Sequence, residues 1–378
     1  MTAPSSNTLL RNSHIALPDE LEAYLQNNFS GKEISHEPVA VDEPYGAVWA
    51  AHLASQGNVC QLLQACYPQL NFPIQEGINK TQEYIDAVLK GKPCTAGYTP
   101  VLSQPERVRL QVHASLIGTV PVLIVPDNED FVRLVQCFLH KNNPMPVPSS
   151  MGASLLNGLN NWERIHALKR SWLRTNPAET WNLEFSKNVL PNPGLYKDKL
   201  ILLSTKPYSN VPADRLGLTE AAWSAYSLSI RLEHECAHLY TLRRFGCATN
   251  NLHDELIADY IGISKTLGTY RKDWMLAFMG LEAYPAYRKG ARLENYLGDT
   301  NLTPEGFSQL TTLIKQAIES IARFDTALGP IRSAQDQMSR MDALCTTDLI
   351  DIASVKGANR LLQMYQESAE VMKYNQND

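Results

Sequence analysis

Apolar positions in the first hundred residues recur mostly with helical spacing, and polar stretches separate them. Proline and acidic residues at a first turn mark helix starts, and glycines mark breaks. The segments predicted here are a polar tail over residues 1–17, a helix over Pro18–Phe29, a loop over residues 30–43, helical stretches over Pro44–Cys66 with a break at Gly57, and a helix over Gln75–Leu89 that stops at Gly91. We therefore expect an N-terminal helical region over residues 1–100.

The apolar period shortens to two residues after Pro100. Val108, Leu110 and Val112 alternate with polar neighbours, which is typical of a half-buried strand. The predicted strands lie at residues 108–113, Val120–Val125, Trp181–Ser186 and Leu200–Leu203, the predicted helices at Asp127–His140 and Leu155–Leu173, a Pro- and Ser-rich loop at Asn142–Ser154, and a turn at Pro207–Asn210. Together these strands predict one small mixed sheet.

The C-terminal half has a mainly helical pattern. Thr219 is a capping residue type and Gly246 a typical helix end, which predicts one long helix between them. A second helix is predicted over Asp254–Leu267, and later helical segments are divided at Pro285, Gly290, Gly298, Pro304 and Gly329-Pro330. The predicted fold is α+β and helix-rich, with residues 101–378 forming one domain that contains the sheet and ends in C-terminal helices.

Composition excludes several classes of partner. The 378 residues are 44% hydrophobic and 19% charged with a net charge of −5, and no Lys/Arg-rich run is present, so nucleic acid is not an expected partner. No apolar run approaches the ~18 residues of a bilayer span, and the N-terminus lacks the pattern of a secretory signal. Seven scattered cysteines without a CxxC pair favour reduced thiols. We expect a cytoplasmic protein without a membrane partner.

The chemistry of the chain concentrates in the long predicted helix. His234, Glu235 and His238 are spaced as HExxH. Residues i and i+4 lie one turn apart on the same helix face, so the two imidazoles can converge on one metal ion. Glu235 need not ligate, but it can reach a water bound to that metal. This pattern predicts a zinc hydrolase centre, although the five-residue motif also occurs in ordinary helices.

A second helix supplies carboxylates in a matching pattern. Glu255 and Asp259 are spaced as ExxAD, one turn apart. One of them can provide the third ligand, and the other can accept a hydrogen bond from a ligating imidazole. His253 is the rival third ligand, but two residues from Glu255 it faces elsewhere on the helix. Cys236 points away from both histidines and is expected to be a core thiol.

The sequence HECAH followed by ELIAD resembles the gluzincin zinc metallopeptidases, over about Arg231–Ile263. The resemblance implies a zincin-like catalytic unit with one zinc ion. It implies that His234, His238 and Glu255 are the zinc ligands, that Glu235 is the general base, and that Asp259 hydrogen-bonds a ligand histidine, His234 by preference. The metzincin pattern does not fit, because Thr241 and Arg244 replace its glycine and third histidine.

A tetrahedral oxyanion needs a hydrogen-bond donor besides the metal. Gluzincins often take it from a later segment, and here the stretch AYPAYRKGARLENY offers several candidates. Arg292 is our first choice and Tyr287 our second, with ordinary helix-surface positions as the alternative for each. By analogy with zincin folds, the predicted strand at Leu200–Ser204 is a candidate edge strand for pairing with extended substrate.

Three functional hypotheses follow. The first is a zinc metallopeptidase that cleaves a peptide bond. The second is a zinc amidohydrolase of a small molecule or peptide-derived metabolite, because most of the chain shows no peptidase resemblance. The third is a non-catalytic binding protein with a structural zinc, against which Glu235 argues, since a structural site needs no base.

Overall fold

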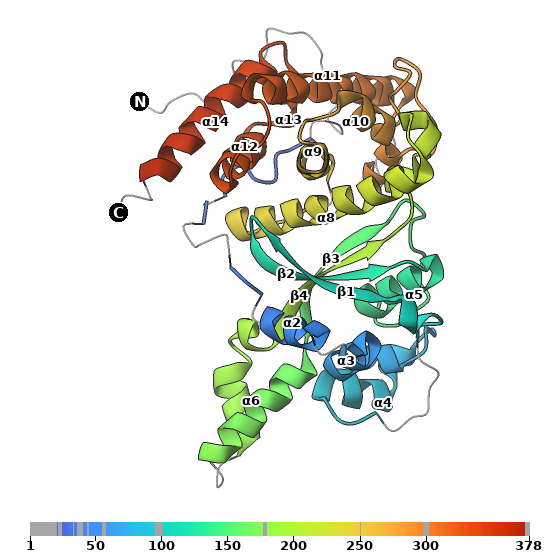
Figure 1. Cartoon of the computed structure of the whole chain (residues 1–378), viewed down its shortest axis with the longest axis vertical. Helices are drawn as coiled ribbons and strands as arrows, with labels where there is room; N and C mark the ends of the chain where they lie inside the picture. The colour runs from blue at the N-terminus through green and yellow to red at the C-terminus, as the bar shows by residue number, and fades with distance from the viewer. Residues whose placement is uncertain are drawn as a thin grey trace.

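The computed structural model describes residues 21, 25–32, 34–35, 41–43, 45–54, 58–94, 101–176, 180–249, 251–297 and 302–374. The predicted tail over residues 1–17, half of the predicted helix Pro18–Phe29, and the breaks at Gly57 and Gly298 lie outside these residues. The architecture is α+β and rich in helix, as predicted. A central sheet has one group of helices on each side (Figure 1).

The sheet has four strands in the order β1-β2-β4-β3. Their bounds are β1 Arg109–Ser115, β2 Gly118–Val125, β3 Ala153–Asn160 and β4 Lys197–Ser204. The β1–β2 and β3–β4 pairs are antiparallel, whereas β2 and β4 run parallel, so the predicted small mixed sheet is confirmed. The two edges of the sheet are β1 and β3.

Successive side chains of the central strands point to opposite faces of the sheet, and this divides the core into two layers. Val122 and Ile201 pack with the C-terminal helices, whereas their neighbours Leu123 and Leu202 pack with the helices on the other side. The helices on that second side are α2 Gly46–Ala54, α3 Val59–Cys66, α4 Gln82–Tyr84, α5 Asn128–Leu139, α6 Trp162–Thr175 and α7 Trp181–Glu184, and α6 and α7 lie farthest from the sheet. Two of them continue as π-helices, α4 into η4 Ile85–Leu89 and α7 into η6 Phe185–Val189. Residues of α2 and α3 share their cluster with strand residues, and the predicted domain boundary at residue 100 stays a prediction.

Two predicted elements were wrong. The helix expected over Leu155–Leu173 begins only at Trp162, after the Asn161 cap, because the preceding residues form β3 and pair with β4. The strand expected over Trp181–Ser186 is helical. Its alternating apolar residues have no strand to pair with, and Trp181 instead contacts Phe185 one turn later, with ring centroids 5.9 Å apart.

Helix α8, Glu220–Phe245, crosses the face of the sheet, and α9, Leu252–Leu267, packs on it from the other side (Figure 1). Both helices match their predictions closely. The Thr219 side chain accepts a hydrogen bond from the α8 first turn, and Gly246 ends the helix with a left-handed φ of 70°. The helices approach closely at Gly262, where a Cβ would lie 2.8 Å from the Ile230 carbonyl oxygen.

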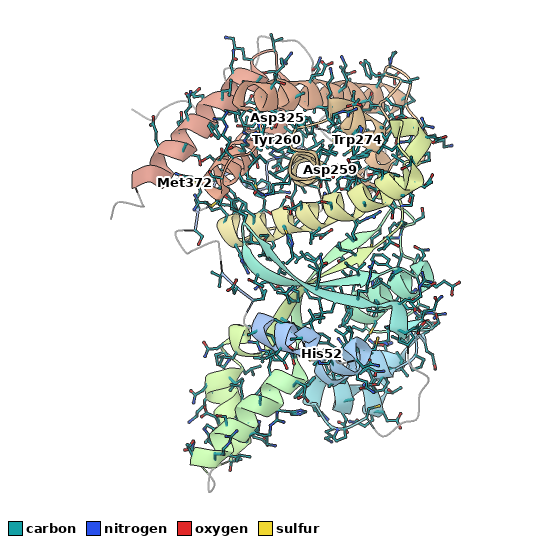
Figure 2. The ribbon with its side chains drawn as sticks, in the orientation of Figure 1. His52, Asp259, Tyr260, Trp274, Asp325 and Met372 are labelled. Atoms are coloured by element: carbon teal, nitrogen blue, oxygen red, sulfur yellow. The ribbon has the colours of Figure 1, made fainter. Side chains whose placement is uncertain are left out.

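The C-terminal helices cover α8 and α9 on the side away from the sheet. They are α10 Lys272–Met279, α11 Pro304–Leu328, α12 Ala334–Thr346, α13 Leu349–Ala353 and α14 Gly357–Tyr374. Figure 2 marks Trp274 and Asp325 within this layer and Tyr260 on α9, which the layer covers. Short 3₁₀ turns are η2 Pro68–Asn71, η3 Ile78–Lys80, η5 Pro105–Arg107, η7 Pro193–Leu195, η8 Tyr208–Asn210, η9 Ala213–Leu216 and η10 Arg292–Tyr296. Among the described helices, none is both long and apolar enough to cross a membrane.

Candidate metal centre

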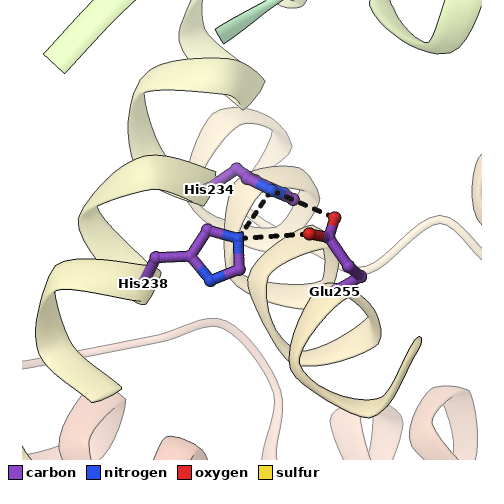
Figure 3. Close-up of side chains that lie close together, drawn as sticks. All are labelled: His234, His238 and Glu255. Atoms are coloured by element: carbon purple, nitrogen blue, oxygen red, sulfur yellow. Dashed lines mark hydrogen bonds and ion pairs between the residues drawn. The ribbon is translucent and has the colours of Figure 1, made fainter. Parts of the chain in front are cut away.

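The α8–α9 pair brings the predicted metal ligands together. His234 and His238 lie one turn apart on α8, and Glu255 lies in the first turn of α9 (Figure 3). The two Nε2 atoms are 3.0 Å apart, and the Glu255 carboxylate oxygens lie 3.4 Å from His234 Nε2 and 3.6 Å from His238 Nε2. One ligand atom from each residue lies within 4.8 Å of the other two. Tetrahedral zinc bonds of about 2.0–2.1 Å would separate their ligands by about 3.3 Å, close to these distances.

The outer nitrogens of both imidazoles face carboxylates. His234 Nδ1 lies 2.9 Å from Asp259 Oδ1, and His238 Nδ1 lies 3.3 Å from Asp254 Oδ2. A proton on each Nδ1 leaves the two Nε2 lone pairs facing one another. Because lone pairs 3.0 Å apart repel, this arrangement fits a cation between them.

The charges around the cluster also favour a bound cation. Burial raises the pKa of Glu255, but the two histidines and Arg292 outweigh burial and hold that pKa well below its ordinary value. Burial lowers the pKa of His238, but Asp254 and Glu255 outweigh it and raise that pKa well above its ordinary value. Both shifts show a cluster that attracts positive charge, which a proton or a metal ion can supply.

Asp259 is fully buried behind His234 and binds three groups. Its Oδ1 accepts hydrogen bonds from His234 Nδ1 and, at 2.5 Å, from the Tyr208 hydroxyl, and its Oδ2 accepts one from Arg292 Nη2. Burial raises the pKa of Asp259, but Arg292 and His234 hold it below its ordinary value. The predicted hydrogen bond between Asp259 and His234 is therefore present, and it fixes the orientation of that imidazole.

Glu235 lies in the same cavity as the ligand atoms but outside the three-residue cluster. Burial raises the pKa of its carboxyl group, against the lowering effect of the two histidines. The backbone of Leu155 on β3 also lowers this pKa slightly. A carboxylate with a raised pKa beside a candidate metal-binding cluster is suited to accept and return a proton.

A cavity of about 490 Å³ opens over the cluster between β3, α8 and η10. Its walls mix polar and apolar groups. They comprise Pro148, Ser150, Met151, Gly152, Ala153, Ser154, Leu155, Asn157, Tyr208, Ser209, Arg231, His234, Glu235, His238, Leu242, Ala248, Thr249, Glu255, Arg292, Asn295 and Tyr296. A space of this volume accommodates a small ligand or a short stretch of peptide.

The two residues predicted to stabilise an oxyanion lie in different surroundings. Arg292 lines the cavity, and its guanidinium is engaged by Asp259, by Ser209 Oγ at 3.0 Å and by Glu255 Oε2 at 3.4 Å. Tyr287 is not among the residues that line the cavity, and its hydroxyl donates to the Ala291 carbonyl at 3.2 Å. The geometry favours another tyrosine of the same stretch, described next.

Tyr296 lines the cavity and donates its hydroxyl to Glu255 Oε2 at 2.9 Å. The sequence offered it as one candidate among several. Helical spacing could not select it, because residues 292–296 form the 3₁₀ turn η10 and not an α-helix. Within this turn Arg292 and Tyr296 both reach Glu255, and the guanidinium carbon of Arg292 lies 5.7 Å from the Tyr296 ring centroid.

The structure also places the rejected candidates. His253 points away from the cluster, with its Nε2 3.0 Å from the Leu344 carbonyl oxygen, so it is not the third ligand. Cys236 is a buried free thiol in the core, as predicted. The predicted edge strand Leu200–Ser204 was wrong, because β4 lies between β2 and β3. The edge beside the cluster belongs to β3, which the sequence pattern had assigned to a loop and a helix.

Sequence reasoning missed two side chains that hold the histidines. Tyr208, in the predicted turn after β4, lies with its hydroxyl 3.0 Å from His234 Nδ1. Asp254 faces His238 from the position just before Glu255. The adjacent acids in HDELIAD were a usable signal for Asp254. For Tyr208 the only signal was its place in a loop directly after a buried strand, where functional residues concentrate.

Comparisons with known proteins identify a family without an assigned activity. A model described as "Family of unknown function (DUF7005)" matches residues 10–356, so the chain belongs to this family. No curated protein and no solved structure matches the chain.

Proposed function

We propose that this member of the DUF7005 family is a zinc-dependent hydrolase that cleaves a peptide or related amide bond. One observation carries the proposal. His234, His238 and Glu255 converge within 4.8 Å of one another, and the carboxyl group of Glu235 lies in the same cavity. Two histidines, one carboxylate and a separate acid in a cavity form the donor set of a hydrolytic zinc centre.

His234, His238 and Glu255 would hold the ion. When bound there, zinc supplies a Lewis acid and a water whose pKa is lowered towards ~7. Glu235 accepts the proton from the attacking water and returns it to the leaving amine. In the balanced reaction one water is consumed, the C–N bond breaks, the water oxygen stays on the acyl carbon, and the products are a carboxylate and a protonated amine.

The surroundings support a gluzincin-type peptidase with a zincin-like unit. HExxH lies on α8 and ExxAD on α9, and Asp259 holds His234 in place. The edge strand β3 runs along the cavity, where an extended peptide could add to the sheet. Within the described residues no fourth histidine, cysteine or acid joins the cluster, which supports a catalytic over a structural zinc.

A small-molecule amide is the second candidate substrate. The observation in its favour is the cavity volume of about 490 Å³, which lies within the range of ordinary small-ligand sites. A panel containing peptides and N-acyl amino acids separates the two candidates. Turnover of peptides longer than about three residues would exclude an enzyme restricted to small amides, since the cavity would then have to extend along β3.

The proposed function is tested with three variants. We expect one zinc ion per wild-type chain, loss of zinc in Glu255→Ala, and retained zinc in Glu235→Gln with hydrolysis reduced by about 10³-fold. Glu233→Gln is the matched control, because Glu233 lies on the same helix and faces His113 at 3.3 Å. Metal analysis and a peptide-hydrolysis assay give the readouts. Unchanged zinc in Glu255→Ala, or unchanged hydrolysis in Glu235→Gln, would contradict the proposal.

A further inference from the structure

Arg231 is a buried cation in the cavity wall. It lies one helical turn before Glu235 on α8 and is 2% exposed. Its Nη1 donates to the carbonyl oxygens of Ser204 at 3.4 Å and Lys206 at 2.5 Å, and its Nη2 donates to Pro207 at 2.9 Å. Among the described residues no carboxylate forms an ion pair with it. Buried charges are usually neutralised by a partner, so this guanidinium is a candidate to bind an anion from the substrate.

A second cation lies close to the same part of the wall. Lys206 Nζ donates to the Ser149 carbonyl, and burial together with the charge of Arg231 lowers the pKa of Lys206 to about 8. The neighbouring Gly152 packs directly on Arg231, since a Cβ there would lie 2.5 Å from its Nε. Asn295 Nδ2 donates to Ser150 Oγ at 2.7 Å and joins η10 to this segment. This end of the cavity is therefore positively charged, and a hydrogen bond joins η10 to the segment before β3 across it.

The cavity has a direction set by α8 and β3, which run alongside each other. Gly152 packs on Arg231, and three residues later the backbone of Leu155 lies close enough to Glu235, one turn further along α8, to lower its pKa. Beyond this point the described lining residues are uncharged and comprise Asn157, Leu242, Ala248 and Thr249. Among the described lining residues the carboxylates are Glu235 and Glu255, at the centre of the cavity, and Asp254 behind the far end is already bound by the Thr249 N–H at 2.7 Å, so no lining carboxylate awaits a free α-amino group there.

We propose that Arg231 binds the α-carboxylate at the C-terminus of a peptide substrate, so that the chain is a carboxypeptidase-type exopeptidase. This inference rests on the proposed function. One helical turn, about 6 Å, separates Arg231 from Glu235, and an extended peptide advances about 3.4 Å per residue. The hydrolysed amide bond therefore lies one or two residues before the C-terminus. Hydrolysis consumes one water and releases a single amino acid or a dipeptide with its amine protonated.

The same placement fixes the direction of the bound peptide. With its carboxylate at Arg231, beside Gly152, the peptide runs towards the N-terminal end of β3 and is antiparallel to that strand. Antiparallel addition to a sheet edge is the commoner pairing and makes close, well-aligned hydrogen bonds. The outer edge of β3 up to Asn157, which pairs with no other described strand, would carry the residues that precede the cleaved bond.

The test uses zinc-loaded Glu235→Gln protein and a matched pair of peptides. The two peptides share one sequence, and one has a free C-terminus while the other is C-terminally amidated. Calorimetry should show about tenfold tighter binding of the free acid, because a charge-assisted pair with Arg231 is lost in the amide. Adding Arg231→Gln should remove this preference. Arg215→Gln, which changes an arginine paired with Glu282 outside the cavity, should keep it.

The outcomes separate this inference from the function it rests on. Equal affinity for acid and amide, or no binding of either, overturns carboxylate recognition. A preference that survives Arg231→Gln places the carboxylate elsewhere, for example on the zinc, and also overturns it. Because Arg231→Gln could unfold the segment that it holds, the acid-to-amide comparison without this change stands as a test by itself. Wild-type hydrolysis of both peptides at equal rates would refute the exopeptidase and leave the hydrolase intact.

Discussion

Two side chains from one short turn hold Glu255 in place. Tyr296 donates to Glu255 Oε2 at 2.9 Å, and Arg292 Nη2 lies 3.4 Å from the same oxygen. The other oxygen, Oε1, faces His238 at 3.6 Å. Because Oε2 is engaged by donors, Oε1 is the better placed of the two to bind a metal ion. Groups that orient a metal ligand in this way usually contribute to metal affinity.

Replacing Tyr296 by Phe should therefore weaken zinc binding. We expect an affinity loss of about tenfold, since partners of metal ligands contribute about 10–100-fold. The matched control is Tyr287→Phe, in which a hydroxyl bound to the Ala291 carbonyl is lost outside the cavity. Competition with a chromophoric chelator measures both variants. Equal zinc affinities in the two variants would mean that Tyr296 does not support Glu255.

At the scale of single residues, the sequence predicted the side-chain positions that helical geometry determines. The pairs His234–His238 and Glu255–Asp259 follow from positions one turn apart on single helices. Tyr208 and Tyr296 could not be predicted in this way, because they reach the site from a loop and a 3₁₀ turn that are distant in sequence. Their positions depend on how the chain packs between the helices.

The α8–α9 crossing determines the geometry of the ligand cluster. Two ligands come from α8 and one from α9, so the distance between the helices sets the distances between the ligand atoms. Gly262 allows the close approach, since an added Cβ would lie 2.8 Å from the Ile230 carbonyl oxygen and 3.1 Å from its Cγ2. Real side chains do not tolerate the first of these contacts, and a backbone oxygen cannot rotate away from it.

Gly262→Ala should separate the two helices and lower both stability and zinc affinity. In an exposed helix interior the same change would stabilise by about 1 kcal/mol, so a destabilisation reports the steric contact. Gly306→Ala is the control, because its Cβ would meet nothing closer than Thr303 Oγ1 at 3.4 Å. Thermal unfolding with and without zinc measures the effect. A stabilised Gly262→Ala protein with normal zinc affinity would show that the helices can separate without affecting the site.

Helix boundaries with strong local signals were predictable, whereas elements that depend on partners were not. Thr219 and Gly246 bound α8 through capping and a left-handed turn, both of which are local effects. In contrast, the segment at Ala153–Asn160 is a strand because β4 pairs with it, with an irregularity at Gly158, where φ is 81°. Local spacing favoured a helix there, and long-range pairing overrode that preference.

The whole molecule places the cluster where three parts of the chain meet. β3 supplies the edge, α8 and α9 supply the ligands, and η10 returns from the C-terminal layer to cover the cavity. Several buried polar groups there have their charges balanced within the protein, as with Asp259 and Arg292. The imidazole pair is different, because its two Nε2 atoms face each other at 3.0 Å and need a shared proton or a cation between them. Metal binding is therefore expected to be coupled to the stability of the α8–α9 pair.

Removal of zinc should lower the unfolding temperature of the protein. A ligand that binds only the folded state at a concentration of 100 times its Kd stabilises by about 2.7 kcal/mol, which corresponds to a shift of roughly 5–11 °C for a domain of about 150–250 residues. Calorimetry of zinc-loaded and chelator-treated protein measures this shift. His238→Ala should unfold at the same temperature with and without chelator, because it lacks one ligand of the cluster. A shift in unfolding temperature that persists in His238→Ala would place the stabilising metal elsewhere in the molecule. If the unfolding temperature of the wild type does not change, a proton satisfies the facing lone pairs of His234 and His238.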